Sequence, residues 1–198
     1  MKMIYRILAF IILALVLMIA FSPYGKKDGF AYPLVYHETI IGAPSDSVFA
    51  FLGRSSNARF WSSYVDHITP LNTGNITDGT RGAERRCFKN KNEEGIIWDE
   101  RITVVEKNSR RQLTIFNMQG FPLIAEGLAT EQTYTNTKDG KTRLAFTLFF
   151  LGKEPSWIEK LKTYYAAYFV KNIYERNLEN IKTIIESGNC HSAPYPHE

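Results

Sequence analysis

The sequence opens with an uninterrupted apolar stretch. Residues 7–21 carry no charged side chain, and Arg6 is the only charge in residues 3–21. At about 1.5 Å of rise per residue, a helix of this length just crosses a hydrocarbon core of about 30 Å. A domain of this size cannot surround such a helix with apolar partners on every side. The pattern therefore predicts an N-terminal helix that crosses a membrane.

Two interpretations of this stretch compete, a cleaved signal peptide and an uncleaved anchor. A cleavable apolar core usually has about 7–15 residues and is followed by small residues. The nearest small-x-small cleavage site for a signal peptidase is Ala-Phe-Ser at residues 20–22. Pro23 would directly follow the cleaved bond, and proline at that position disfavours cleavage. We therefore favour an anchor over residues 1–22, although the sequence leaves cleavage open.

Basic residues flank the apolar stretch on both sides. Lys2 and Arg6 favour a cytoplasmic amino terminus and a domain on the periplasmic or extracellular side, while Lys26 and Lys27 weaken that asymmetry. Because only Asp28 opposes these four residues, they carry most of the formal net charge of +4. The rest of the chain is close to neutral despite a pI of about 9.0.

A near-neutral domain is a poor candidate for nucleic-acid binding, which needs a basic face. Residues 81–91 hold five basic side chains but are interrupted by Glu84. We interpret this segment as the solvated face of a strand and its hairpin. No nucleic-acid partner is expected.

Residues 23–33 contain proline, glycine, lysine and aspartate and read as a linker. The pattern then predicts a strand at Leu34–Ile41, a helix opening at Ser45 or Asp46, and a second short helix at residues 55–64. Six further strands follow at hairpin spacing, at residues 65–71, 80–90, 95–107, 112–119, 124–136 and 141–151. A long helix over residues 154–187 ends the domain, which spans residues 34–188. The polar tail at residues 189–198 is expected to be disordered.

Several short motifs occur in a definite order along residues 36–186. They are Ile-Gly-Ala-Pro-Ser-Asp-Ser-Val-Phe at 41–49, Asn-x-x-x-Trp at 57–61, Arg-Cys at 86–87, Trp-Asp-Glu-Arg-Ile at 98–102, Gly-Lys-Thr-Arg-Leu at 140–144 and Asn-Leu-Glu-Asn-Ile-Lys at 177–182. In this order the chain resembles the START-like (SRPBCC) superfamily, especially its polyketide cyclase/dehydrase-like branch. The resemblance implies an α+β helix-grip fold, in which a curved seven-stranded antiparallel sheet surrounds a long C-terminal helix with two short helices. It does not specify a function, because this fold hosts carriers, lipid-transfer domains, quinone-binding proteins, cyclases and hormone receptors.

A curved sheet around one helix encloses a cavity unless large side chains fill the gap. Strand alternation predicts two inward rows, Ile96, Trp98, Glu100, Ile102 and Val104 on one strand and Leu144, Phe146, Leu148 and Phe150 on the last strand. The helix is expected to turn Leu161, Tyr165, Tyr168 and Phe169 toward the sheet. The candidate ligand-binding residues are Trp61, Arg85, Trp98, Glu100, Phe146, Tyr165 and Tyr168.

Glu100 is the most informative of these residues. A carboxylate among apolar neighbours is unfavourable unless it is paired or protonated, and Arg85 on the neighbouring strand offers a partner. Glu100 could anchor a ligand, or act as a general acid or base with a raised pKa, which makes it the candidate catalytic residue. The plainer alternatives are a structural ion pair or a carboxylate that reaches solvent.

Three functions stay open. The one we favour is a membrane-anchored binding module for an apolar ligand, such as a lipid, an isoprenoid or a polyketide-like molecule. The second is a cyclase or dehydratase that uses the cavity carboxylate, which would need at least two convergent polar groups. The third is a ligand-free interaction domain at the membrane, which would expose an apolar patch.

Cofactor and metal motifs are missing from the sequence. There is no Gly-x-Ser-x-Gly, no phosphate-binding loop and no dinucleotide fingerprint. The four histidines have no metal-ligand spacing, and the two cysteines, Cys87 and Cys190, are interpreted as free thiols. We therefore expect neither a cofactor nor a metal.

Overall fold

The computed structural model describes residues 2–152 and 155–188 of the 198-residue chain. The predicted start of the long helix at residue 154, and the tail with Cys190, lie outside the described residues. The elements are α1 (Lys2–Ala20), β1 (Leu34–Ile41), α2 (Ser45–Gly53), the 3₁₀ helix η1 (Ser55–Asn57), α3 (Ala58–Trp61), β2 (His67–Pro70), β3 (Glu84–Phe88), β4 (Ile97–Glu106), β5 (Arg110–Gln119), β6 (Leu128–Asn136), β7 (Thr142–Phe150) and α4 (Trp157–Glu186).

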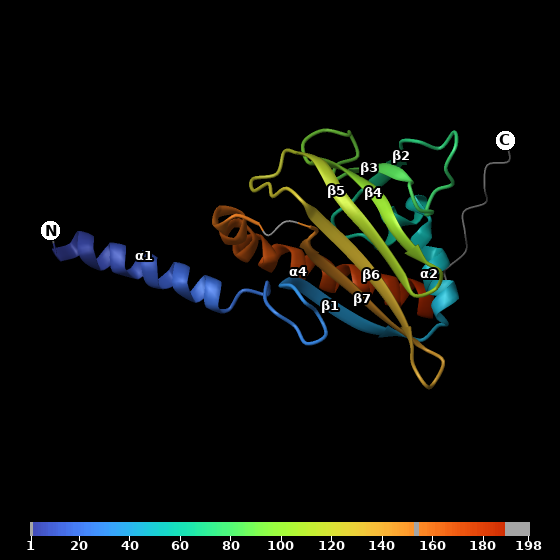
Figure 1. Ribbon diagram of the computed structural model, residues 1–198, viewed down its shortest axis with the longest axis horizontal. Helices are drawn as coiled ribbons and strands as arrows, with labels where there is room; N and C mark the ends of the chain where they lie inside the picture. The colour runs from blue at the N-terminus through green and yellow to red at the C-terminus, as the bar shows by residue number, and fades with distance from the viewer. Residues whose placement is uncertain (1, 153–154, 189–198) are drawn as a thin grey trace.

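The strands form one antiparallel sheet in the order β1-β7-β6-β5-β4-β3-β2. Strands that follow one another in the chain from β2 to β7 are neighbours in the sheet. Strand β1 pairs with β7 and forms one edge of the sheet, and β2 forms the other. Figure 1 shows the sheet curving around α4, while α1 projects from the end of the domain where α4 begins. The predicted α+β fold, a seven-stranded antiparallel sheet with a long C-terminal helix, is confirmed.

Helix α4 has a well-defined beginning and end. The Ser156 hydroxyl accepts a hydrogen bond from the Glu159 backbone N–H, and the Glu159 carboxylate accepts one from the Ser156 N–H, so both ends of a capping box are made. At the other end, Gly188 has φ +71°, a left-handed conformation that stops the helix at little steric cost. The second half of α4 packs tightly, since Leu178 and Ile181 are fully buried in the main core.

Several predicted elements differ in their bounds from the observed ones, β3 for instance spanning Glu84–Phe88 and not residues 80–90, and two of the differences have a local physical reason. Strand β6 begins at Leu128 rather than at residue 124, because Pro122 lacks a backbone donor and Gly127 has φ +74°, so that residues 121–127 form a loop. The expected second helix is split into η1 and α3 and ends at Ser62. The Ser62 hydroxyl accepts hydrogen bonds from the backbone N–H groups of Tyr64 and Val65. The chain turns there toward β2.

Residues 23–33, for which the sequence predicts a linker, pack against the domain. Tyr24 is 4% exposed and lies beside Val35 and Ala167. Tyr32 stacks on Phe149 with a centroid distance of 4.8 Å. Phe149 on the outer face of β7 is therefore buried, at 3% exposure, which strand alternation alone does not predict.

Helix α1 is the one element among residues 2–152 and 155–188 that is long and apolar enough to cross a membrane. Its window Met3–Ala20 has a mean hydropathy of 2.7, and none of it is buried against the domain. Length and composition alone support this reading, and a signal sequence would have the same properties.

Candidate functional site

A cavity of about 830 Å³, partly open to solvent, lies between the inward face of the sheet and the first half of α4. Most of its wall is apolar and includes Ile96, Leu113, Ile115, Met118, Phe121, Leu123, Ile124, Leu128, Leu148, Val170 and Ile173. The space exists because α4 presents small side chains there, Thr163, Ala166 and Ala167, where its second half presents leucine and isoleucine.

All seven sequence-predicted residues line this one cavity, namely Trp61, Arg85, Trp98, Glu100, Phe146, Tyr165 and Tyr168. They fall into two groups. Arg85, Trp98, Glu100 and Phe146 are buried inner residues, whereas Tyr165 is 61% exposed at the rim. Contact of these residues with a ligand stays a prediction.

The orientation of α4 corrects one expectation. Tyr165, Tyr168 and Phe169 do not point at the sheet but lie along the rim, and Leu161 is also exposed. The residues that face the sheet in this half of the helix are Thr163 and Ala167, which are 5% and 1% exposed. The helix carries apolar residues on two sides, so its periodicity alone did not identify the side that the sheet covers.

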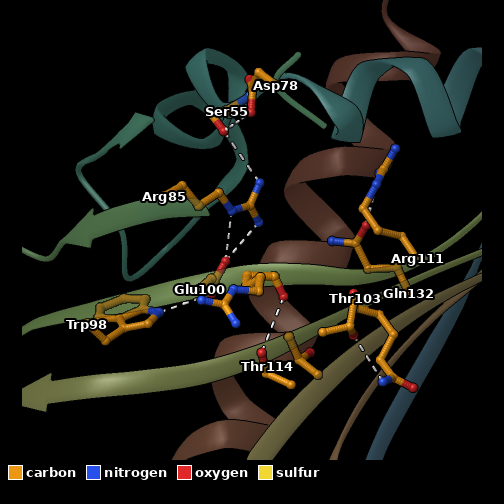
Figure 2. A network of polar contacts seen from close by, with 12 residues as sticks. Ser55, Asp78, Arg85, Trp98, Glu100, Thr103, Arg111, Thr114 and Gln132 are labelled. Carbon is orange, nitrogen blue, oxygen red and sulfur yellow. Dashed lines mark hydrogen bonds and ion pairs between the residues drawn. The ribbon is translucent and has the colours of Figure 1, made fainter. Parts of the chain in front are cut away.

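An ion pair lies in the cavity wall, as Figure 2 shows. The Glu100 Oε2 accepts hydrogen bonds from Arg85 Nε at 2.9 Å and Nη2 at 2.8 Å. The Trp98 Nε1–H donates to the other oxygen, Oε1, at 3.0 Å. Arg85 and Glu100 are directly opposite one another on β3 and β4, which is why strand alternation could suggest the pair.

The electrostatics favour the charged form of Arg85. Burial lowers the pKa of the Arg85 guanidinium, but the attraction of the Glu100 carboxylate outweighs burial and the pKa lies above its ordinary value. Arg85 also reaches the Ser55 hydroxyl at 3.5 Å, and that hydroxyl donates to Asp78 at 2.7 Å. Both oxygens of Glu100 therefore face donors within the protein, which fits the structural ion pair better than a general acid.

Cys87, the cysteine that the structure describes, is a buried free thiol. Burial and the nearby Glu100 carboxylate raise its pKa well above the ordinary value. A thiol that resists ionisation is a poor nucleophile. Cys87 is therefore not a candidate for covalent chemistry, and it does not line the cavity.

A second polar group was missed by the sequence analysis. Arg111, which is 2% exposed, donates from Nη1 to Gln132 Oε1 at 3.4 Å and to the Tyr134 hydroxyl at 3.2 Å. Tyr134 in turn donates to Gln132 Oε1 at 2.7 Å. Burial lowers the pKa of Arg111 below its ordinary value. Arg111 on β5 lies directly opposite Gln132 on β6. This pairing could have identified the group, but the sequence alone does not give the register between the two strands.

The Gln132 amide has a definite orientation. Arginine only donates hydrogen bonds, so the atom of Gln132 that meets Arg111 must be the carbonyl oxygen. The amide nitrogen then lies on the other side of the group, and Gln132 is part of the cavity wall. Figure 2 shows the side chain ending beside Arg111. Gln132 thus offers the cavity a donor whose direction is set by two buried partners.

Polarity changes along the cavity. Along β6, the residues that line it are Leu128, Thr130 and Gln132, in order from the mouth inward. The Thr130 hydroxyl is hydrogen bonded to the Tyr174 hydroxyl at 2.9 Å. The row on β6 is therefore apolar at Leu128 and polar at Gln132, and the cavity wall also includes the Arg85–Glu100 pair.

No protein-family model matches the sequence, and a search of curated proteins finds no match. Solved structures do match. A protein from Nitrosospira multiformis is 14% identical over 79% of this chain and 99% of its own, with a TM-score of 0.59. Ara h 8.0201 is 13% identical over 78% of this chain and 97% of its own, with a TM-score of 0.55. The di-domain ARO/CYC BexL from the BE-7585A biosynthetic pathway is 13% identical over 77% of this chain and 46% of its own, with a TM-score of 0.59. At such identities these likenesses concern the fold alone, and with the sheet wrapped around α4 they establish that this chain has a helix-grip fold.

Proposed function

We propose that this protein is a membrane-anchored START-like (SRPBCC) domain, of the polyketide cyclase/dehydrase-like branch, that binds an apolar molecule in its cavity. The observation that carries the proposal is the cavity of about 830 Å³ with a mostly apolar wall. Ligand pockets typically measure about 300–1,000 Å³ and are lined in this way. The length and hydropathy of α1 support the anchor, and Lys2 and Arg6 support a domain on the exported side.

Binding is favoured over catalysis by the state of Glu100. A general base needs a lone pair directed at its substrate, and Arg85 and Trp98 occupy three of the roughly four acceptor positions of Glu100. The cyclase or dehydratase alternative is supported by the likeness to BexL and by the convergence of Gln132 with the Arg85–Glu100 pair. It would rely on the second lone pair of Glu100 Oε1, because Trp98 Nε1 donates to the first.

The inner end of the cavity narrows the class of ligand. The Gln132 amide nitrogen has no acceptor among residues 2–152 and 155–188, so an oxygen of the ligand is well placed to satisfy it. We therefore infer a ligand with an extended apolar body and one hydrogen-bond acceptor, such as a carbonyl or hydroxyl oxygen, that reaches Gln132. Lipid, isoprenoid and polyketide-like molecules can all carry such a group.

Native mass spectrometry of the full chain, purified in nanodiscs from its own host, tests the proposed function. We expect a stoichiometric apolar adduct that disappears after solvent extraction and returns when the extract is added back. A ligand-free mass, together with no uptake of fluorescent fatty acids, would contradict the binding function.

The substitution Gln132→Glu tests the inferred acceptor. The carboxylate still accepts from Arg111 and Tyr134, so stability should be kept, while the donor to the ligand is lost. We expect ligand affinity to fall about tenfold, which corresponds to about 1.4 kcal/mol. Titration calorimetry with the extracted ligand measures this change.

Gln112→Glu is the matched control for that substitution. Gln112 is a buried glutamine on the neighbouring strand that bonds Thr103 and Arg110 and does not line the cavity. Its replacement should leave ligand affinity unchanged. Equal affinities of the Gln132→Glu protein and the parent would remove Gln132 from the site.

A further inference from the structure

An exposed apolar face lies on the first turns of α4. The large apolar side chains in residues 157–169 that are exposed are Trp157, Ile158, Leu161, Tyr165, Tyr168 and Phe169. Steps of three or four residues along a helix return to the same side, which places Trp157, Leu161, Tyr165 and Tyr168 in one row. We call these six residues the α4 face. Single exposed apolar residues are common, but a contiguous set of this size marks a contact surface.

The α4 face lies beside the point where α1 joins the domain. The Tyr168 hydroxyl donates a hydrogen bond to the Met18 backbone carbonyl at 2.8 Å. The Ser22 hydroxyl donates to the Tyr164 backbone carbonyl at 2.7 Å. With Tyr24 buried against Ala167, these contacts determine where α1 leaves the domain relative to α4. Figure 1 shows α1 leaving the domain on the side where α4 begins.

Met18 belongs both to the apolar window of α1 and to the cavity wall. Among the side chains of residues 3–20, it is the one that is not exposed. The β5–β6 loop contributes Phe121, Leu123 and Ile124 to the same mouth, and Ile124 is itself 42% exposed. The candidate membrane span, the mouth of the cavity and the α4 face are therefore continuous.

We propose that the bilayer which holds α1 also covers the α4 face and the cavity mouth, so that the cavity opens to lipid and not to water. This inference rests on the proposed function in one respect, that α1 remains as an uncleaved anchor. Amphipathic surfaces settle about 5–10 Å into the boundary between headgroups and acyl chains, and tryptophan and tyrosine favour that depth. The face carries Trp157 at its beginning and meets the end of the span at Tyr168, so both aromatic types belong to it.

The consequence concerns how the ligand enters. An apolar molecule that leaves a bilayer for water loses the free energy of apolar burial, about 25 cal/mol per Å² of surface. If the cavity mouth contacts lipid, the ligand enters without passing through water. The last turn of α1 would then line the route from the bilayer into the cavity. The ligand source is thus the membrane that carries the anchor.

Fluorescence quenching of labelled full-length protein in phosphatidylcholine–phosphatidylglycerol vesicles tests this placement. In a background with Cys87→Ala and Cys190→Ser, a bimane label is placed at Leu161→Cys on the α4 face, outside the cavity wall. The matched control is Lys138→Cys, an exposed position in the β6–β7 turn at the far end of the domain. We expect lipid-borne nitroxides to quench the label at 161 several-fold more strongly than the label at 138, and aqueous iodide to show the reverse order.

Two results would overturn the inference. One is equal access of iodide to both labels, which means that water covers the α4 face. The other is protection of the label at 161 from both quenchers, which means that a protein or a second copy covers it. A second label at Tyr165→Cys guards against a local effect of the probe and should follow the label at 161.

The depth measurement needs no ligand, so the two proposals fail separately. A label at 161 in lipid together with an empty cavity in native mass spectrometry would remove the binding function and support the placement. A water-exposed label together with a stoichiometric adduct would remove the placement and support the binding function.

Discussion

Replacing Glu100 with leucine is expected to lower the free energy of unfolding by about 3–5 kcal/mol. The substitution removes the carboxylate that faces Arg85, and Arg85 is 6% exposed. A buried guanidinium without a counter-charge keeps its desolvation penalty, and Trp98 Nε1 loses its acceptor at the same time. Urea unfolding of the full chain in mild detergent, followed by near-ultraviolet circular dichroism, measures the shift in midpoint.

Two controls separate burial from charge. The double substitution Arg85→Met and Glu100→Leu leaves no unpaired charge and should recover most of the loss. Glu84 on β3 forms an ion pair with Arg101 on β4, and the Arg101 side chain is 54% exposed. The substitution Glu84→Leu removes that exposed pair. That change should cost no more than about 1 kcal/mol. If Glu100→Leu were no more destabilising than Glu84→Leu, the Arg85–Glu100 pair would not be the buried contact described above.

Filling the cavity with Ile115→Trp is expected to abolish the stoichiometric ligand while the domain stays folded. Ile115 lies on β5 opposite Glu100, and its side chain is part of the cavity wall. The larger ring occupies space that the ligand would need, and tryptophan is well tolerated in strands. Ligand affinity should fall by at least about tenfold, or about 1.4 kcal/mol. Native mass spectrometry detects the adduct, and the unfolding midpoint verifies the fold.

The adjacent residue supplies the control for this substitution. Thr114 is on the same strand, its hydroxyl reaches the Arg101 backbone carbonyl, and it does not line the cavity. Thr114→Trp should therefore keep the adduct. Undiminished affinity in the Ile115→Trp protein would mean that the ligand binds elsewhere, and the cavity would lose its assigned role.

Local patterns were sufficient for the fold and for half of the site. Strand Leu34–Ile41 was predicted with its observed ends, because Gly42 follows a run of residues that favour strands. Alternation with a period of two put Trp98 and Glu100 on the inward face, and it suggested Arg85 as the partner of Glu100. These are properties of single strands and their nearest neighbours, which a sequence states directly.

Contacts between distant segments were beyond that reach. The sequence alone determined an apolar N-terminal helix, a run of antiparallel strands, one long C-terminal helix and an inward carboxylate. Only the tertiary structure decided which side of α4 meets the sheet, and it turned Ala167 inward and left Tyr165 at the rim. It also decided the β5–β6 register that sets Arg111 against Gln132, and the packing of Tyr24 that joins α1 to the domain. The physical reason is that local sequence allows several arrangements. A helix with two apolar sides can turn either side to the sheet, and a polar residue on an inward row can pair with more than one partner. Packing against the rest of the chain selects one arrangement.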